Sequence, residues 1–417
     1  MKIPILVLTA LLPAVAMAAD PGPATVAINQ LGLELFRQVA AASPGGNVVL
    51  SPFSIQSALA MTYAGAEGET RTEMARVLHF PADDAPLATD FAVLRAELDL
   101  MVKSGGLLAA TQAGAGAKVD TIEWHLANRL FGQTGYQFRD PFVTVTRNSY
   151  GAPLAQLDFK TGPEAARTTI NAWVGEQTQG KIQDLIPPAG VSNLTRLVLV
   201  NALYLKAPWQ EKFSPTSTKE RAFTVSGGQP VPVPTMYNDI SYGHMKYPNF
   251  TAVAIPYLGG DLQFVILLPD APDGVDALAA QVTPELLLGC TKLEQHKIQL
   301  YLPKFRLTPP TLPLGKMLQS LGMKQAFNDP PGSANFARMV EPQSGDNLGL
   351  AEIYHKTFVA VDEEGTEAAA ATAAAMWSLG IQMPRPPEVH VDHPFLFAIQ
   401  HRVSGACLFL GRVTDPR

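Results

Sequence analysis

A hydroxyl and an imidazole are the groups from which a hydrolase would build its nucleophile and its general base. Ser51 and His355 are the pair to weigh in this chain of 417 residues. Pro52 follows Ser51 directly, so the G-x-S-x-G turn that exposes many serine nucleophiles is missing there. A serine followed by a proline is instead typical of the start of a helix. The sequence therefore predicts that the protein is not an enzyme.

Side chains that bind metals or carry redox chemistry form no convincing cluster in the sequence. His390 and His393 are close together on an expected turn, but no cysteine or further carboxylate supports a metal site there. We therefore expect no metal and no cofactor. Of the two cysteines, Cys290 and Cys407, the second lies in an apolar run and is expected to be a buried thiol. The sequence leaves open whether the two form a disulfide.

The segment 361–375 has the most unusual composition of the chain. It reads V-D-E-E-G-T-E and then contains only alanine and threonine. Alanine favours a helix, but a helix here would have no apolar face to bury. Small side chains at every position suit a segment that inserts between two existing strands without steric conflict. An alanine-rich surface linker is the alternative interpretation, and the other motifs decide between the two.

The overall composition is that of an ordinary globular protein, with 47% hydrophobic and 16% charged residues. The net charge is −6 and no long basic run is present, which argues against nucleic acid as a partner. Residues 1–18 predict a signal peptide, with Lys2 at its positive start and a small-x-small cleavage site at its end. Its apolar stretch is too short to span a membrane, so we expect no membrane partner. We expect a single domain over 19–417, secreted and either extracellular or periplasmic.

The spacing of apolar residues predicts helices mainly in the first half of the chain and strands in the second. Helices are expected over 25–42, from Pro52 onward and over 70–78, the last with Thr70 and Glu73 as a capping box. Residues 104–118 are rich in glycine and alanine, which predicts a loop or a frayed helix end. Strands are expected at 47–50, 124–131, 196–206, 252–255, 262–268, 298–302, 357–361, 395–400 and 408–413. This order predicts an α+β fold.

Five further motifs agree with one another in content and order. They are S-P-F-S-I from Ser51, N-A-W-V-G-E-Q-T-Q-G-K-I-Q-D-L-I from Asn171, L-V-L-V-N-A-L-Y-L-K-A-P-W from Leu197, L-P-K-F from Leu302 and D-H-P-F-L-F from Asp392. Together with the segment 361–375, they resemble the serpins, a family of serine protease inhibitors, from about residue 25 to the C-terminus. The resemblance implies three β-sheets, eight or nine helices and an exposed reactive loop over about 363–387.

The same resemblance implies roles for individual residues. A polar "shutter" beneath the central sheet would contain Ser51, Ser54, Asn201 and His355. Hydroxyl, amide and imidazole groups can satisfy one another when they are buried. Trp209 would be the "breach" tryptophan, at the point where the loop enters the sheet. The hinge of the loop would comprise Glu363, Gly365, Thr366, Glu367, Ala368, Ala370 and Thr372.

Inhibitory members of the family let a target protease cleave the loop and trap it as an acyl-enzyme while the loop inserts as an extra strand. Counted from Glu363 in the manner of the family, the cleaved bond would join Leu379 and Gly380, with Met376 and Met383 as alternatives. Leucine suits chymotrypsin-like pockets and Met376 suits elastase-like ones. We therefore expect a monomeric suicide-substrate inhibitor of such serine proteases. A non-inhibitory serpin with a binding, chaperone or storage role is the alternative.

Overall fold

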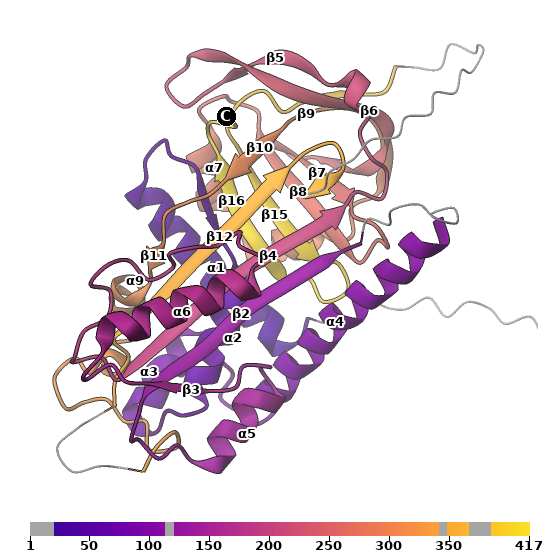
Figure 1. Cartoon of the computed structure of the whole chain (residues 1–417). Helices are drawn as coiled ribbons and strands as arrows, with labels where there is room; N and C mark the ends of the chain where they lie inside the picture. Colours follow the sequence, from indigo (N-terminus) through magenta and orange to yellow (C-terminus); the bar gives the residue numbers. More distant parts are fainter. Residues whose placement is uncertain (1–20, 113–120, 342–347, 367–384) are drawn as a thin grey trace, which may run out of the picture.

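The computed structural model describes residues 21–112, 121–341, 348–366 and 385–417, and these fold into two β-sheets with helices packed around them (Figure 1). The described helices are α1 (Pro23–Ala42), α2 (Pro52–Tyr63), α3 (Gly68–Val77), α4 (Leu87–Gln112), α5 (Asp140–Asn148), α6 (Pro163–Gln177), α7 (Val275–Gln281), α8 (Pro284–Cys290) and α9 (Gly315–Ser320). This mixed architecture confirms the predicted α+β fold class.

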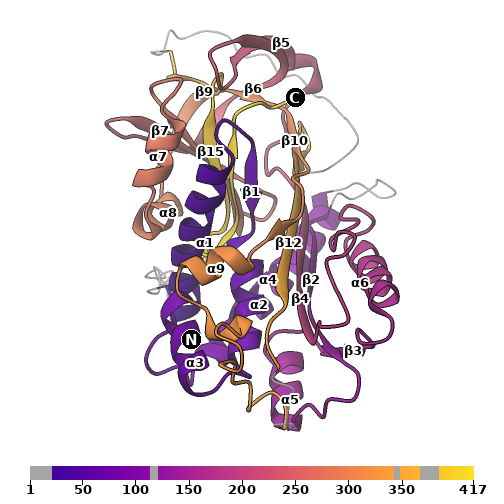
Figure 2. The same cartoon turned by 90° about the vertical axis from the view of Figure 1, so that its left-hand side faces the viewer.

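The seven-stranded sheet has the order β10-β12-β13-β4-β2-β3, with β11 paired to β12. Helix α6 covers one face of this sheet, and α2 lies on the other side (Figure 2). β4 is therefore buried on both faces, which explains why its sequence is apolar almost throughout. The strands are β2 (Glu123–Gln133), β3 (Ala155–Leu157), β4 (Leu197–Pro208), β10 (Phe305–Leu307), β11 (Leu312–Pro313), β12 (Glu352–Val361) and β13 (Gly365–Thr366).

The nine-stranded sheet has the order β1-β16-β15-β8-β7-β6-β9-β14, with β5 paired to β6. The long strand β6 pairs with β5 and β9 and then with β7, so it joins two regions that would otherwise be separate sheets. This continuity explains why the described residues show two hydrogen-bonded sheets where three were expected. The strands are β1 (Val48–Leu50), β5 (Lys219–Thr224), β6 (Pro230–Lys246), β7 (Phe250–Pro256), β8 (Leu262–Pro269), β9 (Gln295–Pro303), β14 (Glu388–His390), β15 (Phe395–His401) and β16 (Cys407–Val413).

One local expectation is wrong, and the structure decides between two alternatives that another left open. Helix α3 begins at Gly68, and the Thr70 hydroxyl accepts a hydrogen bond from the Asn335 amide rather than capping the helix. The Glu73 carboxylate likewise accepts from the amides of Lys324 and Gln325, so the capping box is wrong. Helix α4 continues through residues 104–112, where a loop was one of the two alternatives. In both places contacts with the rest of the fold decide a structure that local sequence left ambiguous.

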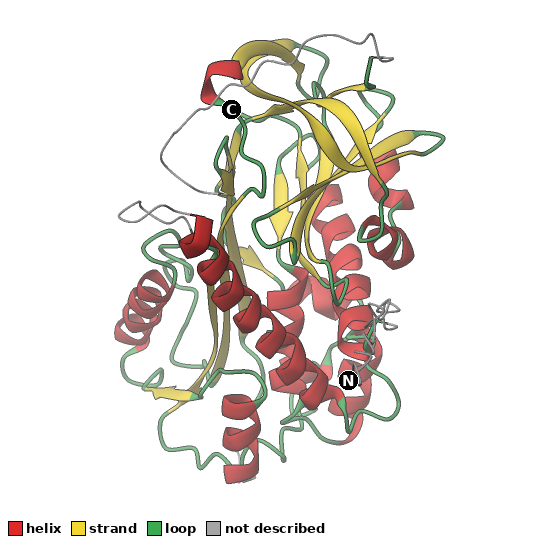
Figure 3. Cartoon of the chain, turned by 90° about the vertical axis from the view of Figure 1, so that its right-hand side faces the viewer, coloured by secondary structure: helices red, strands yellow, loops and turns green. Residues whose placement is uncertain are grey.

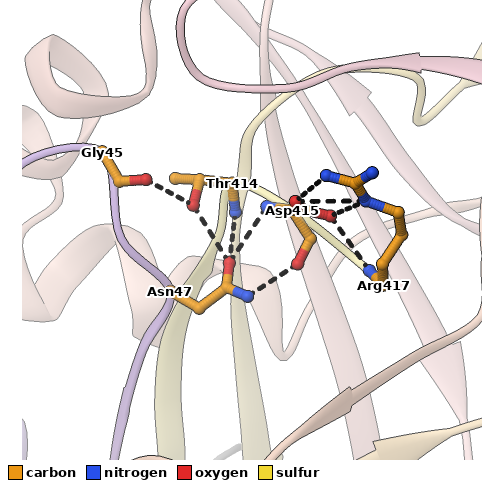
Figure 4. A network of polar contacts seen from close by, with 5 residues as sticks. All are labelled: Gly45, Asn47, Thr414, Asp415 and Arg417. Carbon is orange, nitrogen blue, oxygen red and sulfur yellow. Dashed lines mark hydrogen bonds and ion pairs between the residues drawn. The ribbon is translucent and has the colours of Figure 1, made fainter. Parts of the chain in front are cut away.

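The C-terminus is fastened to the turn that follows α1 (Figure 4). The Asn47 side-chain oxygen accepts hydrogen bonds from the amides of Thr414 and Asp415, at 2.7 and 3.1 Å. Its amide nitrogen donates to the Asp415 carbonyl at 2.6 Å, and the Thr414 hydroxyl donates to the Gly45 carbonyl at 2.9 Å. One side chain thereby holds the strand β16 next to β1, at the edge of the nine-stranded sheet.

Neither cysteine of the described chain is in a disulfide, and both thiols are buried. The Cys407 thiol donates to the Phe409 carbonyl, which agrees with the buried thiol expected there. None of the described helices is long and apolar enough to cross a membrane.

Candidate functional site

The most unusual local structure is a two-residue strand that enters the seven-stranded sheet between β12 and β4. These two strands pair in parallel up to Phe358 and Tyr204 and then separate. β13 occupies the gap beyond that point and runs antiparallel to both neighbours, with Thr366 opposite Val361 on one side and Ala207 on the other. The sheet is therefore already open at one end, and the chain that follows Val361 has begun to fill it.

Gly365 is required at this entry because the backbones approach closely. A Cβ atom placed on Gly365 would lie 2.1 Å from the Ala207 carbonyl oxygen and 2.6 Å from the Pro208 Cα. Its φ of +155° also lies in a region that side chains other than hydrogen rarely adopt. Three backbone hydrogen bonds hold the turn: the Trp209 amide donates to the Glu364 carbonyl, the Phe213 amide to the Glu363 carbonyl, and the Asp362 amide to the Gly365 carbonyl.

Thr366 is buried and contacts an aromatic side chain that directly follows β7. Only 1% of its surface is exposed, and its hydroxyl is 2.5 Å from the Tyr257 hydroxyl. The Tyr257 ring stacks on Trp209, with centroids 4.6 Å apart. The Trp209 indole also donates to the Asp362 carbonyl at 2.9 Å, so this tryptophan contacts both sides of the turn. The structure thus places Trp209 at the entry point that the resemblance assigned to it.

Two lysines neutralise the acidic residues that precede Gly365. Lys304 Nζ lies 2.6 Å from Glu363 Oε2, and Lys212 Nζ lies 2.6 Å from Glu364 Oε2. The Thr218 hydroxyl donates to the other Glu363 oxygen at 2.8 Å. Burial acts to raise the pKa of Glu363, but the hydrogen bonds from Lys304 and Thr218 outweigh it and keep that pKa below its usual value. Glu363 is therefore ionised at neutral pH and anchors the turn that precedes β13.

The described residues cover only the two ends of the predicted reactive loop, 363–366 and 385–387. Glu363, Gly365 and Thr366 lie together at the opening of the sheet, as described above. The remaining hinge residues and the predicted cleavage positions lie outside the described residues: Glu367, Ala368, Ala370, Thr372, Met376, Leu379, Gly380 and Met383. Their assignment stays a prediction.

The four residues of the predicted shutter meet in one buried polar cluster below the opening. The Ser54 hydroxyl donates to Asn201 Oδ1 at 2.8 Å, and the His355 Nδ1 atom contacts the same oxygen. The Ser51 amide donates to His355 Nε2 at 3.1 Å. Because the imidazole reaches the Ser51 amide, the Ser51 hydroxyl is left to cap α2 by accepting from the Ser54 amide.

Asn128 is a member of this cluster that the sequence analysis missed. Asn201 Nδ2 donates to Asn128 Oδ1 at 2.5 Å, and Asn128 Nδ2 donates to the Ser54 carbonyl at 3.1 Å. The three side chains stand in one row, since Asn201 pairs in register with Asn128 on β2 and with His355 on β12. An amide in the middle of the apolar run W-H-L-A-N-R-L-F was the available signal. We call Ser51, Ser54, Asn128, Asn201 and His355 the polar cluster.

His355 is neutral in the folded protein, because complete burial lowers its pKa to about 3. The unfolded chain takes up a proton near its ordinary pKa, about 6.5. The neutral, buried His355 therefore contributes to the free energy of unfolding. This contribution is complete above pH 6.5 and is lost as the pH falls from there toward 3.

We expect acid to weaken the fold through this residue. Lowering the pH from 7 to 5 should cost about 2 kcal/mol at His355, because the unfolded state binds the proton and the folded state does not. In urea, the wild-type unfolding midpoint should therefore fall more between these two pH values than that of His355→Gln, whose side chain does not titrate. Equal shifts in the two proteins would show that His355 is not the responsible group.

The two histidines weighed as metal ligands bind separate partners. His390 Nε2 lies 2.8 Å from Glu388 Oε2, whereas His393 contacts Asp392 Oδ1 and the Pro269 carbonyl, both at 2.7 Å. Within the part of the chain that the structure describes, no three His, Cys, Asp or Glu side chains are grouped as a metal site would need.

Comparison with known proteins places this geometry in a family. The serpin model, described as serine protease inhibitor, matches residues 26–416. The leukocyte elastase inhibitor of Bos taurus is 37% identical over 401 residues, which cover 94% of this chain and 99% of that protein. The solved structure of Serpin48 from the insect Tenebrio molitor has a TM-score of 0.76 at 30% identity and covers 94% of this chain and 98% of its own. Arabidopsis AtSerpin1 in its native stressed conformation has a TM-score of 0.79 at 28% identity, covering 94% and 98%.

These comparisons also correct one expectation. The absence of the G-x-S-x-G turn at Ser51 predicted only that the protein is not an enzyme. The matched family and the bovine relative are described instead by inhibition of proteases. This description of the relatives as protease inhibitors replaces the prediction that the protein is simply not an enzyme.

Proposed function

This chain belongs to the serpin family of serine protease inhibitors, and on that premise we propose that it is a suicide substrate that traps its target covalently. The observation that carries the proposal is the opening between β12 and β4, which β13 has already begun to fill. A sheet that ends in an open gap can gain hydrogen bonds on both sides of an incoming strand. Insertion of the loop would therefore make the folded protein more stable than it is in its native form.

The chemistry of trapping is that of an interrupted hydrolysis. The serine of the protease attacks the carbonyl of the scissile residue, an ester forms, and the amine of the following residue leaves. The segment that ends at the ester is then free to follow Thr366 into the sheet. Each added residue would continue the antiparallel register that Thr366 starts against Ala207 and Val361. Insertion carries the attached protease along and separates its active-site groups before water can cleave the ester.

Further insertion has to separate β12 from β4 where they now pair directly. The contact between His355 and Asn201 crosses that pair and would be lost. Ser54 and Asn128 still bond to Asn201, and the Ser51 amide still bonds to His355 Nε2, so only His355 Nδ1 loses its partner. Buried polar groups that stay satisfied lower the cost of parting the strands. The polar cluster thus suits a sheet that has to open.

For the target, we favour a chymotrypsin-like or elastase-like serine protease. The bovine relative is named for inhibition of leukocyte elastase, and Leu379 and Met376 offer the apolar side chains that such pockets accept. One copy of the chain is sufficient for trapping, in keeping with the monomer expected from the sequence. A non-inhibitory binding role remains the competing proposal, and the trapping experiment separates the two.

Covalent trapping is the direct test. Mixing the protein with chymotrypsin or pancreatic elastase should give a band on a denaturing gel at the summed mass of inhibitor and enzyme. The same enzymes with their active-site serine blocked beforehand should give no such band, because no ester can form. If both active enzymes cleave the loop and remain fully active, the inhibitory assignment is wrong.

Export is a separate part of the proposal. It is supported by the predicted signal peptide over 1–18, which lies outside the described residues. Sequencing the N-terminus of protein recovered outside the cytoplasm should give a start near Ala19. An intact Met1 in all recovered protein would contradict export.

A further inference from the structure

The chain reverses its direction at Asp362, between the end of β12 and the start of β13. Asp362 to Gly365 form the turn, because Val361 and Thr366 are paired on the antiparallel strands that flank it. In an ordinary β-turn the amide of the fourth residue donates to the carbonyl of the first. Here the Gly365 amide donates to Asp362 Oδ1 at 3.3 Å, and the Glu364 amide donates to the same oxygen at 2.9 Å. A side-chain oxygen therefore closes the turn in place of a backbone carbonyl.

The backbone of Asp362 is held as well as its side chain. Its carbonyl accepts from the Trp209 indole at 2.9 Å, which explains why the carboxylate takes the place of that carbonyl in the turn. Its amide donates to the Gly365 carbonyl at 3.0 Å. The short aspartate side chain is well suited to this position, because it reaches the amide two residues further on. The amide, the carbonyl and the carboxylate of Asp362 thus all hold the path of the chain into the sheet.

This turn sets the register in which later residues can enter the sheet. Thr366 lies opposite Val361, and its side chain points toward the nine-stranded sheet, because its hydroxyl meets Tyr257 directly after β7. Figure 3 shows the seven-stranded sheet nearly edge-on, beside the nine-stranded sheet. Each step forward along the loop is matched by one step back along β12, so residue 368 would lie opposite residue 359. Side chains alternate along a strand, so Ala368 would point the same way as Thr366 and Glu367 the opposite way.

A slip of one residue in this register would exchange the two faces of the inserted strand. Glu367 would then point into the space between the two sheets. Trp209 packs there against the rings of Tyr257 and Phe264, and all three rings are buried. A carboxylate in such surroundings loses its water, which is costly unless a cation pairs with it. Insertion therefore needs the correct register as much as it needs room in the sheet.

We infer that Asp362 is a positioning residue for insertion: its carboxylate closes the turn and thereby fixes the register in which the cleaved loop enters the sheet. This inference rests on the proposed trapping function, and it gives a role to a residue outside the hinge that the sequence predicted. Asp362 acts through the amides of Glu364 and Gly365. An uncharged acceptor of the same length should therefore serve in its place, whereas a longer carboxylate should not.

The fraction of inhibitor that ends in the covalent band with chymotrypsin or elastase tests this role. Asp362→Ala should lower that fraction about fivefold, while the rate of loop cleavage stays similar. Asp362→Asn should restore trapping, because its amide oxygen accepts the same two bonds, and Asp362→Glu should not, because its longer side chain misplaces the oxygen. Asp83→Ala is the matched control: Asp83 accepts from the Ala85 amide at 3.3 Å in the turn before α4, so its loss should leave trapping unchanged. Trapping by Asp362→Glu but not by Asp362→Asn would overturn the inference, since the charge and not the turn would then matter.

Cysteine cross-linking in loop-cleaved protein reports the register directly, and both native thiols are buried. Val359→Cys with Ala368→Cys should form a disulfide after cleavage, because directly opposite residues bring their Cα atoms within reach of one. Ala360→Cys with Ala368→Cys should not.

Adding Asp362→Ala should lower the yield of the first cross-link and raise that of the second. Equal yields with and without Asp362→Ala overturn the inference, and so does a cleaved protein that retains Asp362 and lacks the first cross-link. A wild type that traps neither enzyme, but whose first cross-link forms and depends on Asp362, contradicts the trapping proposal and supports this inference.

Discussion

Cleavage of the chain between Met376 and Met383 is expected to raise the midpoint of thermal unfolding, on the order of 10 °C. The intact sheet is open beyond Phe358 and Tyr204, and β13 fills only two residues of the gap. Once the loop is cut, the residues after Thr366 can pair with β4 and β12 on both edges. If the two new ladders exceed the β12–β4 ladder that insertion breaks by about ten hydrogen bonds, at roughly 1 kcal/mol each, the gain is about 10 kcal/mol. For a chain of this length, that gain corresponds to the expected shift.

The experiment compares intact protein with protein nicked by a catalytic amount of a protease that cuts in this segment. Nicking an ordinary surface loop lowers or preserves stability, so the sign of the change is the informative result. A midpoint that is equal or lower after cleavage would show that the segment does not insert. That result would favour the non-inhibitory alternative while leaving the serpin fold in place.

The elements with strong apolar patterns were predicted well, because burial on two faces leaves a clear signal. The apolar run from Leu197 is a strand covered on both sides, and Ser51 and Pro52 begin a helix as their types indicate. β6 was missed because prolines at 230, 232 and 234 argue against a strand in isolation. In the fold these prolines lie where β6 pairs with the edge strand β5.

The polar cluster could be predicted only in part, for a similar reason. Ser51, Ser54, Asn201 and His355 followed from the resemblance, and the structure brings all four together. Asn128 joins them only because β2 and β4 are in a register that sets it opposite Asn201. A register between distant strands is a tertiary property, so local sequence does not reveal it. Local sequence likewise does not reveal the hydrogen bond between Tyr257 and Thr366 or the contacts of Lys304 and Lys212 with the two glutamates before Gly365, because these contacts also depend on the tertiary fold.

Replacing Thr366 with arginine is expected to turn the inhibitor into a substrate. Thr366 is 1% exposed and is held between Ala207 and Val361, with its hydroxyl on Tyr257. A guanidinium at this position would have to lose its water beside Tyr257, whose ring stacks on Trp209. Burying such an unpaired charge costs several kcal/mol. Each 1.4 kcal/mol added to the activation free energy of insertion slows insertion about tenfold. Hydrolysis of the acyl-enzyme should then be faster than trapping.

The measurement is the fraction of inhibitor that ends in the covalent band rather than in the cleaved form. We expect Thr366→Arg to lower that fraction by at least tenfold while the rate of loop cleavage stays similar, because the scissile bond lies far along the chain from the hinge. Thr366→Ser is the matched control, since it keeps the small volume and the hydroxyl that bonds to Tyr257, and it should trap almost as well as the wild type. Cleaved Thr366→Arg should also lack the rise in unfolding temperature, because both effects depend on the same insertion. An unchanged covalent fraction in Thr366→Arg would show that the chain does not enter the sheet at Thr366, whatever its family.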